Sequence, residues 1–213
     1  RAVKQADITL SDNLNQQNGA IKAQTLNLTA NTLNSLTKSV ISADNLNIIT
    51  SNELSNKDSH IIAKLNGDIQ TGSTLNNKNG TIGSQERSFI INTHQHRLEN
   101  EQGNIIAAQN IDINSGEINN NQGLISANEI AINSNNQSIN NQKTVLKKQG
   151  SKGIIAQHSL TLHSNSLNNN NGNILSRNNA TVNTASLINH QGEIRTQSQL
   201  DLHTNTLEQN NGL

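Results

Sequence analysis

Apolar residues recur along this chain in a pattern that repeats about every twenty residues. The repeating unit is clearest in residues 160–176. An apolar pair two residues apart is followed by a lone leucine, a polar run that ends in glycine, and an Ile-x-small triplet. Ten such units follow one another along the 213 residues. A fixed period of this length is typical of solenoids, in which each unit buries its apolar face only against its neighbours.

The spacing within each unit predicts strands, because apolar residues at i and i+2 with polar residues between them follow the strand period and not the helical one. Each unit offers two or three short strands. The corners between them are rich in Asn and Gly, which tolerate the left-handed conformation of a sharp bend. Such strands pair with the same strand of the next unit. The sequence therefore predicts an all-β solenoid, a parallel β-helix of about ten rungs of roughly 20 residues.

In a parallel β-helix the equivalent residues of successive rungs form columns along the axis. One column of large aliphatic residues is expected at Ile21, Ile41, Ile61, Ile82, Ile105, Ile125, Ile154, Ile174 and Ile194. A column of small residues is expected beside it at Ala23, Ala43, Ala63, Ser84, Ala107, Ala127, Ala156, Ser176 and Thr196. Corner asparagines are expected to stack into hydrogen-bonded side-chain ladders, at Asn15, Asn34, Asn76, Asn119, Asn140 and Asn168.

The composition supports a repetitive core and not an ordinary globular one. The chain has no Cys, Met, Trp, Tyr or Pro, and Phe89 is its only aromatic residue. Its high polarity resembles that of disordered chains, but disorder gives no reason for matched apolar positions. A single rung buries too little apolar surface to fold alone. Because the pattern is cut at both ends, we expect residues 1–213 to form one β-helical segment of a longer solenoid.

The charge balance and the absence of cysteine exclude several kinds of partner and chemistry. Fifteen basic and fifteen acidic residues cancel, so no overall field attracts nucleic acid. No apolar run approaches the roughly 18 residues that a membrane-spanning helix needs. Without cysteine the chain has neither disulfides nor thiolate ligands. We expect no nucleic-acid partner, no membrane-spanning segment and no cofactor.

Catalysis is not expected either, although β-helices include enzymes that act on polysaccharides. Such sites need carboxylates close together to divide the roles of acid and base. The outward position between the paired apolar residues holds acids only at Asp112 and Asp201, several rungs apart. We therefore assign no catalytic residue and expect a protein that is not an enzyme. The alternative requires a carboxylate cluster that folding creates elsewhere.

Two histidines in the enlarged fifth unit form a candidate metal-binding pair. His94 and His96 are two residues apart, and on a strand this spacing places two imidazoles on one face. A solvated loop that contains histidines explains the same motif. We favour the loop and assign no metal site.

The seventh unit contains an insertion, residues 143–152, that is a candidate partner-binding loop. It carries Lys143, Lys147, Lys148 and Lys152 and no acidic residue. Insertions in solenoids form side loops that often bind partners. The simpler interpretation is a tolerated surface excursion, since long loops cost little free energy. The binding hypothesis is that these lysines contact an anionic glycan.

The pattern Leu-Asn-Asn-x-x-Gly-x-Ile-x-Ala/Ser resembles the haemagglutinin repeat of filamentous haemagglutinins. It occurs in residues 75–84 and 167–176, and with Ile in place of Leu in residues 118–127. The resemblance covers essentially the whole chain. Those proteins are two-partner secretion exoproteins of Gram-negative bacteria, which also include contact-dependent growth-inhibition effectors. The resemblance implies a right-handed β-helical filament, exported through a dedicated outer-membrane transporter to the cell surface or the medium.

The resemblance also indicates what such a chain does. It implies a structural shaft that projects an adhesive or toxic tip toward target cells and so contributes to virulence. The alternative is an adhesive binding module that recognises a glycan or another cell-surface receptor through its side loops. Whether the parent protein is an adhesin or a growth-inhibition toxin carrier stays open at this point.

Overall fold

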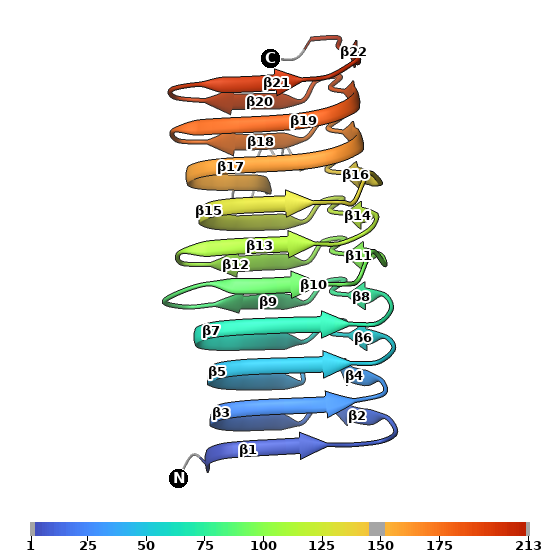
Figure 1. Cartoon of the computed structure of the whole chain (residues 1–213), viewed down its shortest axis with the longest axis vertical. Coiled ribbons are helices and arrows are strands. Elements are labelled where there is room, and N and C mark those ends of the chain that lie inside the picture. The colour runs from blue at the N-terminus through green and yellow to red at the C-terminus, as the bar shows by residue number, and fades with distance from the viewer. Residues whose placement is uncertain (1–2, 145–151, 212–213) are drawn as a thin grey trace.

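The computed structural model describes residues 3–144 and 152–211, and every regular element in these residues is a β-strand. The strands wind into a right-handed parallel β-helix that rises from β1 at one end to β22 at the other (Figure 1). The predicted fold class is therefore confirmed. No helix in the described ranges has the length and apolar character that crossing a membrane requires.

The strands follow one another along the chain with few residues between them. Their bounds are β1 (Val3–Thr9), β2 (Leu14–Gln17), β3 (Ala20–Ala30), β4 (Leu33–Leu36), β5 (Val40–Thr50), β6 (Leu54–Ser55), β7 (His60–Thr71), β8 (Leu75–Asn76), β9 (Thr81–Ser84), β10 (Phe89–Asn92), β11 (Leu98–Glu99), β12 (Asn104–Ala107), β13 (Asn110–Asn114), β14 (Ile118–Asn119), β15 (Leu124–Asn133), β16 (Ser138–Asn140), β17 (Gly153–Asn168), β18 (Asn173–Ser176), β19 (Asn179–Ile188), β20 (Glu193–Thr196), β21 (Leu200–His203) and β22 (Thr206–Glu208).

Each strand pairs in parallel with the equivalent strand of the next turn, as the repeat predicts. Strand β3 pairs with β5, and β5 with β7, so that Ile21, Ile41 and Ile61 stand in one column. In several turns the Ile-x-Ala and Leu-x-Leu segments join into one long strand, as in β3, β5 and β15. In these turns the chain therefore passes from one sheet of the coil to the next by bending, while its backbone remains paired with the neighbouring turns.

The predicted axial columns form the core. The isoleucines at 41, 61, 82, 105, 125 and 154 are fully buried, and Ile174 and Ile194 nearly so. Only Ile21, close to one end of the stack, is half-buried. The small residues from Ala23 to Ser176 lie buried beside them. Both predicted columns are therefore confirmed.

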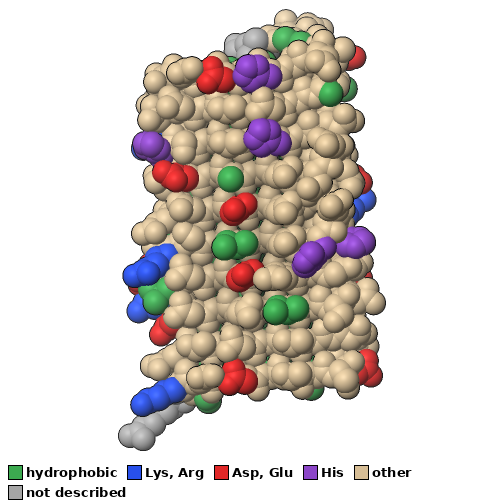
Figure 2. Space-filling model, viewed as in Figure 1, with side chains coloured by type: hydrophobic (Ala, Val, Ile, Leu, Met, Phe, Trp, Pro, Cys, Tyr) green, Lys and Arg blue, Asp and Glu red, His purple; other side chains and the backbone are tan. Residues whose placement is uncertain are grey.

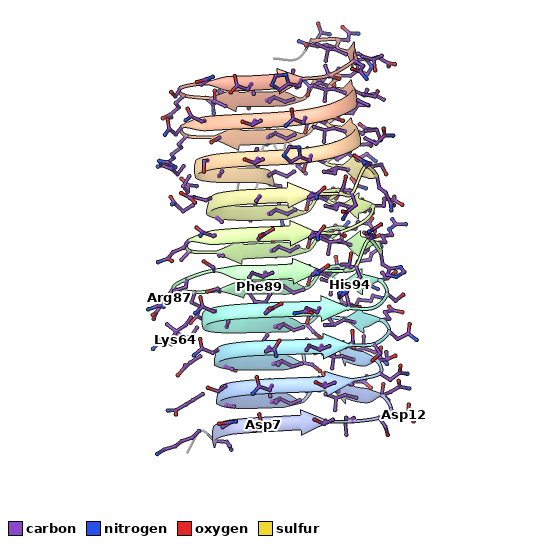
Figure 3. All side chains as sticks on the ribbon, viewed as in Figure 1. Asp7, Asp12, Lys64, Arg87, Phe89 and His94 are labelled. Atoms are coloured by element: carbon purple, nitrogen blue, oxygen red, sulfur yellow. The ribbon has the colours of Figure 1, made fainter. Side chains whose placement is uncertain are left out.

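The only aromatic residue occupies a space that a glycine leaves free. Phe89 of β10 (labelled in Figure 3) is fully buried and stacks directly on Gly67 of β7. A Cβ atom on Gly67 would lie 2.1 Å from Cε2 of Phe89. A large residue in one turn is thus accommodated by a missing side chain in the turn below.

Candidate functional site

The most ordered polar feature of the stack is a ladder of buried asparagines at one corner of the coil. Each side-chain Nδ2 donates to the Oδ1 of the next asparagine, over 2.7–2.8 Å. All of these side chains are fully buried, and most follow directly after the corner asparagines that the sequence analysis proposed. The asparagine ladder consists of Asn56, Asn77, Asn100, Asn120, Asn141, Asn169 and Asn189.

The second amide hydrogen of these asparagines also crosses to the next turn. Asn77 Nδ2 donates to the carbonyl of Asn104 over 3.1 Å, and Asn100 Nδ2 donates to that of Leu124 over 3.2 Å. Most of these side chains therefore bond one corner to two groups of the following turn. Because these amides are shielded from water, a broken bond would leave an unpaired buried group. The ladder holds successive turns in one register.

The predicted ladder was correct in kind but largely placed one residue too early. Of the proposed corner asparagines, Asn34 donates to Asn15 over 2.7 Å and Asn140 to Asn119 over 3.3 Å. The side-chain oxygen of Asn76 instead accepts from the backbone N–H of Lys78. These first asparagines face outward and close the bend. The second Asn of the Leu-Asn-Asn motif was the signal for the buried ladder.

The corner glycines serve the ladder and not the bend, which corrects the expectation that they supply left-handed conformations. The residue with positive φ is the one before the glycine, for example Asn79 (φ 55°) and Gln102 (φ 58°). A Cβ on Gly103 would lie 2.2 Å from the carbonyl oxygen of Asn77 and 2.5 Å from Oδ1 of Asn100. The glycine is required because the ladder leaves no room for a side chain.

The ladder ends at one side without a partner. In the turn below Asn56 the equivalent residue is Ser35, and Asn56 Oδ1 and Ser35 Oγ are both buried without a hydrogen-bond partner. A serine side chain is too short to continue the row of stacked amides. The junction between these two turns therefore lacks the polar bond that joins the turns above it.

Of the predicted lysine loop, the structure describes Lys143 and Lys152, whereas Lys147 and Lys148 lie outside the described residues. Lys143 is an exposed corner residue with φ 54°. Lys152 Nζ donates to Asn104 Oδ1 over 2.8 Å, and burial lowers the pKa of this ammonium group. Gly153 then pairs with Leu124. The insertion therefore leaves and rejoins the coil without disturbing its register.

The predicted histidine pair lies at a corner of the coil, where Figure 3 labels His94. His94 Nδ1 donates to the carbonyl of Thr71 over 3.1 Å, and the backbone N–H of His96 donates to the carbonyl of Thr93 over 2.9 Å. No group of three or more His, Cys, Asp or Glu side chains gathers around a possible metal position in residues 3–144 and 152–211. The motif forms a hydrogen-bonded bend.

The outward acidic residues are more numerous than the sequence analysis predicted. In the sheet that contains β7, β10 and β13, Asp68 pairs with Ile90, and Ile90 pairs with Asp112. Figure 2 views this face, where acidic and apolar side chains alternate along its middle and Lys and Arg lie at its margins. Burial raises the pKa of Asp68, and a hydrogen bond from Gln70 partly opposes that shift. Two turns separate the carboxyl groups, at about 4.8 Å per turn.

Comparison with known families agrees with this architecture. The model of the haemagglutinin repeat matches the chain four times, over residues 1–58, 41–102, 96–151 and 155–213. No curated protein and no solved structure shows significant similarity to the chain. Repeats of this kind are typical of secreted or cell-surface filamentous proteins, and together with the solenoid they fit an adhesin-type shaft. Since the matches extend over the whole sequence, the chain belongs to the haemagglutinin repeat family.

Proposed function

We propose that this chain is a shaft segment of a large, secreted, cell-surface exoprotein that carries a functional tip toward target cells. The parent protein is an adhesin or a contact-dependent inhibition toxin carrier, exported through a dedicated outer-membrane transporter. The segment acts mechanically and not as an enzyme. The observation that supports this proposal is the parallel pairing of every described turn with the next, in which each turn adds about 4.8 Å of length.

The stack has the bonds that a stiff spacer needs. Neighbouring turns share parallel backbone ladders on several sides of the coil, as in the pairs β5 with β7 and β11 with β14. The asparagine ladder adds side-chain bonds at one corner. Bending the shaft would stretch these bonds on one side, and the buried amides among them have no water to replace a lost partner. The absence of cysteine also suits a chain that is exported before it folds.

Deleting one complete turn tests this proposal. Removal of residues 104–123 joins Gly103 to Leu124, and Asn104 and Leu124 are partners in adjacent turns. The shortened chain is expected to keep its β-sheet circular dichroism and cooperative unfolding. Its maximum dimension in small-angle scattering should fall by about 5 Å. The matched control, removal of residues 104–113 only, destroys the register and should unfold the chain.

The same deletion in the parent protein distinguishes a shaft from a binding module. A shaft keeps adhesion or target-cell inhibition when any single complete turn is removed, because only its length changes. A binding module loses activity only when the turn that holds its contacts is removed. Loss of activity with one turn and not with others, in proteins that reach the surface equally well, would reject the shaft proposal.

The second candidate is an adhesive module that uses the 143–152 insertion to bind an anionic glycan or another receptor. It is favoured by the exposure of Lys143 at the outer corner from which the insertion departs. Changing Lys143, Lys147, Lys148 and Lys152 to glutamine should then abolish retention on heparin. The matched control changes Lys22, Lys38, Lys57 and Lys78, which removes the same charge elsewhere. Equal retention of both variants would reject this candidate.

A further inference from the structure

One outward column of the coil is uncharged over its middle turns, whereas acidic and apolar side chains alternate along the middle of the face that Figure 2 shows. It lies on the back sheet, which we define as residues 20–23, 40–43, 60–63, 81–84, 104–107, 124–127, 153–156, 173–176 and 193–196. Strands β9, β12, β18 and β20 of this sheet lie on the far side in Figure 1. The register gives the back column as Lys22, Ser42, Ile62, Gly83, Ile106, Ser126, Ile155, Leu175 and Arg195.

The middle of this column carries no charge, and both of its ends are charged. Ile106 is 39% exposed, and Ile62 and Ile155 are half-buried. Lys22 ends the column on one side. On the other side Arg195 Nε donates to Glu193 Oε1 over 2.9 Å. The aliphatic side chains of this column form a partly exposed apolar strip, and contiguous apolar surface of this kind marks an interaction site.

Small residues separate the large ones in the first half of the column, whereas Ile155 and Leu175 are large residues of adjacent turns. Gly83 has no side chain between Ile62 and Ile106, and a hollow of about 550 Å³ lies over it. Ser126 separates Ile106 from Ile155 in the same way. The large side chains and the small residues between them lie in adjacent turns, so their spacing along the axis is the same in every copy of the chain. The column is therefore able to fit against itself.

We propose that the back column is a self-association surface that binds the back column of a second copy of this chain running in the opposite direction. In this pairing the two-fold axis passes between the turns of Ile106 and Ser126. Ile106 of each copy then meets Ser126 of the other, and Ile155 enters the hollow over Gly83. Leu175 packs against Ile62. The interface is isologous, as expected for a two-fold dimer.

Charge supports the antiparallel arrangement over the parallel one. Two parallel copies related by an axis along the shaft place every residue of the column opposite itself. Lys22 then faces Lys22, Arg195 faces Arg195, and each isoleucine meets an isoleucine instead of a gap. In the antiparallel arrangement Arg195 of each copy lies opposite Ser42 of the other, so that no like charges of the column face each other directly.

The size of the surface sets the strength of the pairing. Eight steps of about 4.8 Å make the column roughly 38 Å long. With a neighbouring column on each side, its contact area is roughly 600 Å² per copy, at the low end for specific interfaces. We expect a weak dimer that forms at high protein concentration. Longer shafts with similar columns would pair more strongly, because each further turn adds contact area without a further loss of translational and rotational entropy.

Sedimentation of the 213-residue chain tests the proposal with a matched pair of substitutions. The unmodified chain is expected to form dimers as its concentration rises toward the millimolar range. Ile106→Lys places a charge in the middle of the back column and should weaken dimerisation at least tenfold. Ile90→Lys is the control, because Ile90 is 47% exposed on the other face. A chain that stays monomeric, or equal weakening by both substitutions, overturns the proposal.

Disulfide trapping tests the direction of the pairing. Because the chain contains no cysteine, only the introduced cysteines can form a disulfide. In the antiparallel dimer Ile62→Cys lies opposite Leu175→Cys of the second copy. A mixture of the two variants should therefore form a cross-linked dimer on oxidation, while neither variant does so alone. Self-cross-linking of each variant alone indicates parallel pairing and overturns the proposed arrangement. The proposed shaft role would stand in either case, because it does not require pairing.

Discussion

The same corner of the coil is built in two ways, and the difference explains where glycine is needed. From Asn56 upward the buried corner residue is asparagine. In the turn directly above Asn56, the corner glycine position holds Gly80. In the turns below, Gln16 and Ser35 occupy the ladder position, and the glycine position above Ser35 holds Ser59. The glycine is thus selected by the backbone carbonyl of the turn below and the ladder side chains beside it, and not by its own backbone angles.

The serines that replace glycine make hydrogen bonds of their own. Ser39 Oγ donates to the carbonyl of Gln16 over 3.1 Å, and the backbone N–H of Ser39 donates to Ser59 Oγ over 3.3 Å. These bonds use the space that an amide ladder fills in the later turns. The comparison indicates that ladder asparagines and corner glycines depend on each other, and three predictions test this dependence.

The largest effect is expected where a side chain is forced onto the ladder. Gly103→Ala brings a Cβ to 2.2 Å from the carbonyl of Asn77, a backbone atom that cannot move aside. Overpacking of a rigid site costs about 3 kcal/mol. Urea unfolding of the chain should show this loss of stability.

Gly19→Ala is the matched control, because it occupies the same corner position in a turn without the ladder. There the new Cβ would meet Gln16 Cγ at 3.1 Å, in a flexible side chain. We expect a change of no more than about 0.5 kcal/mol. Equal destabilisation by the two substitutions would show that glycine is needed for the bend itself and would contradict the proposed role of the ladder.

The second effect follows from removing one amide of the ladder. Asn100→Ala deletes the donor to Asn120 Oδ1 and the acceptor of Asn77 Nδ2. Buried groups left without partners cost about 2 kcal/mol together with the lost bonds. Ser35→Ala is the control, since Ser35 Oγ has no partner to lose. If Ser35→Ala destabilises the chain as much as Asn100→Ala, the ladder contributes nothing beyond packing.

The repeat in the sequence was sufficient to predict the stack, both core columns and, beyond the first strand, the register. Periodicity determines these features, since Ile41, Ile61 and Ile82 must stack if the turns are equal in length. It does not tell which of two adjacent polar residues turns inward. For that reason the ladder was mostly assigned to Asn76 and its equivalents instead of Asn77. Distinguishing them requires the geometry of the bend, in which the first asparagine closes the turn.

The surface was harder to predict than the core. Gly83 and Ile106 belong to different strands, and only the register of β9 with β12 reveals that they are neighbours in one outward column. Likewise only the register of β7, β10 and β13 reveals that Asp68 and Asp112 stand in one column, on either side of Ile90. Outward columns carry no apolar periodicity, so small departures from the repeat hide them.

The third prediction extends the ladder by one turn. Ser35→Asn supplies the amide that Asn56 Oδ1 lacks, but the side chain of Ser59 above it occupies the space that glycine leaves free in other turns. Ser35→Asn combined with Ser59→Gly should therefore be more stable than the sum of the single substitutions, by about 1 kcal/mol. A double-mutant cycle in urea measures this coupling. Additive effects would mean that the two positions do not depend on each other.

The smallest effect concerns a buried oxygen that, unlike an amide, can bind a proton. Asp68 Oδ1 is buried without a partner, and burial raises the pKa of this carboxyl group. The folded chain then binds more protons than the unfolded chain between the ordinary Asp pKa of 3.8 and the raised value, so stability falls as pH rises through that window. Asp68→Asn removes the charge and should stabilise the chain at pH 7 by no more than about 0.5 kcal/mol, because the group is partly solvated. The gain should vanish below the ordinary Asp pKa.

Asp7→Asn is the control. It replaces a carboxylate that accepts from both Asn27 and Gln5, and it should give no such gain. An identical effect of Asp68→Asn at pH 3 and pH 7 would show that the unpaired oxygen carries no cost that protonation relieves.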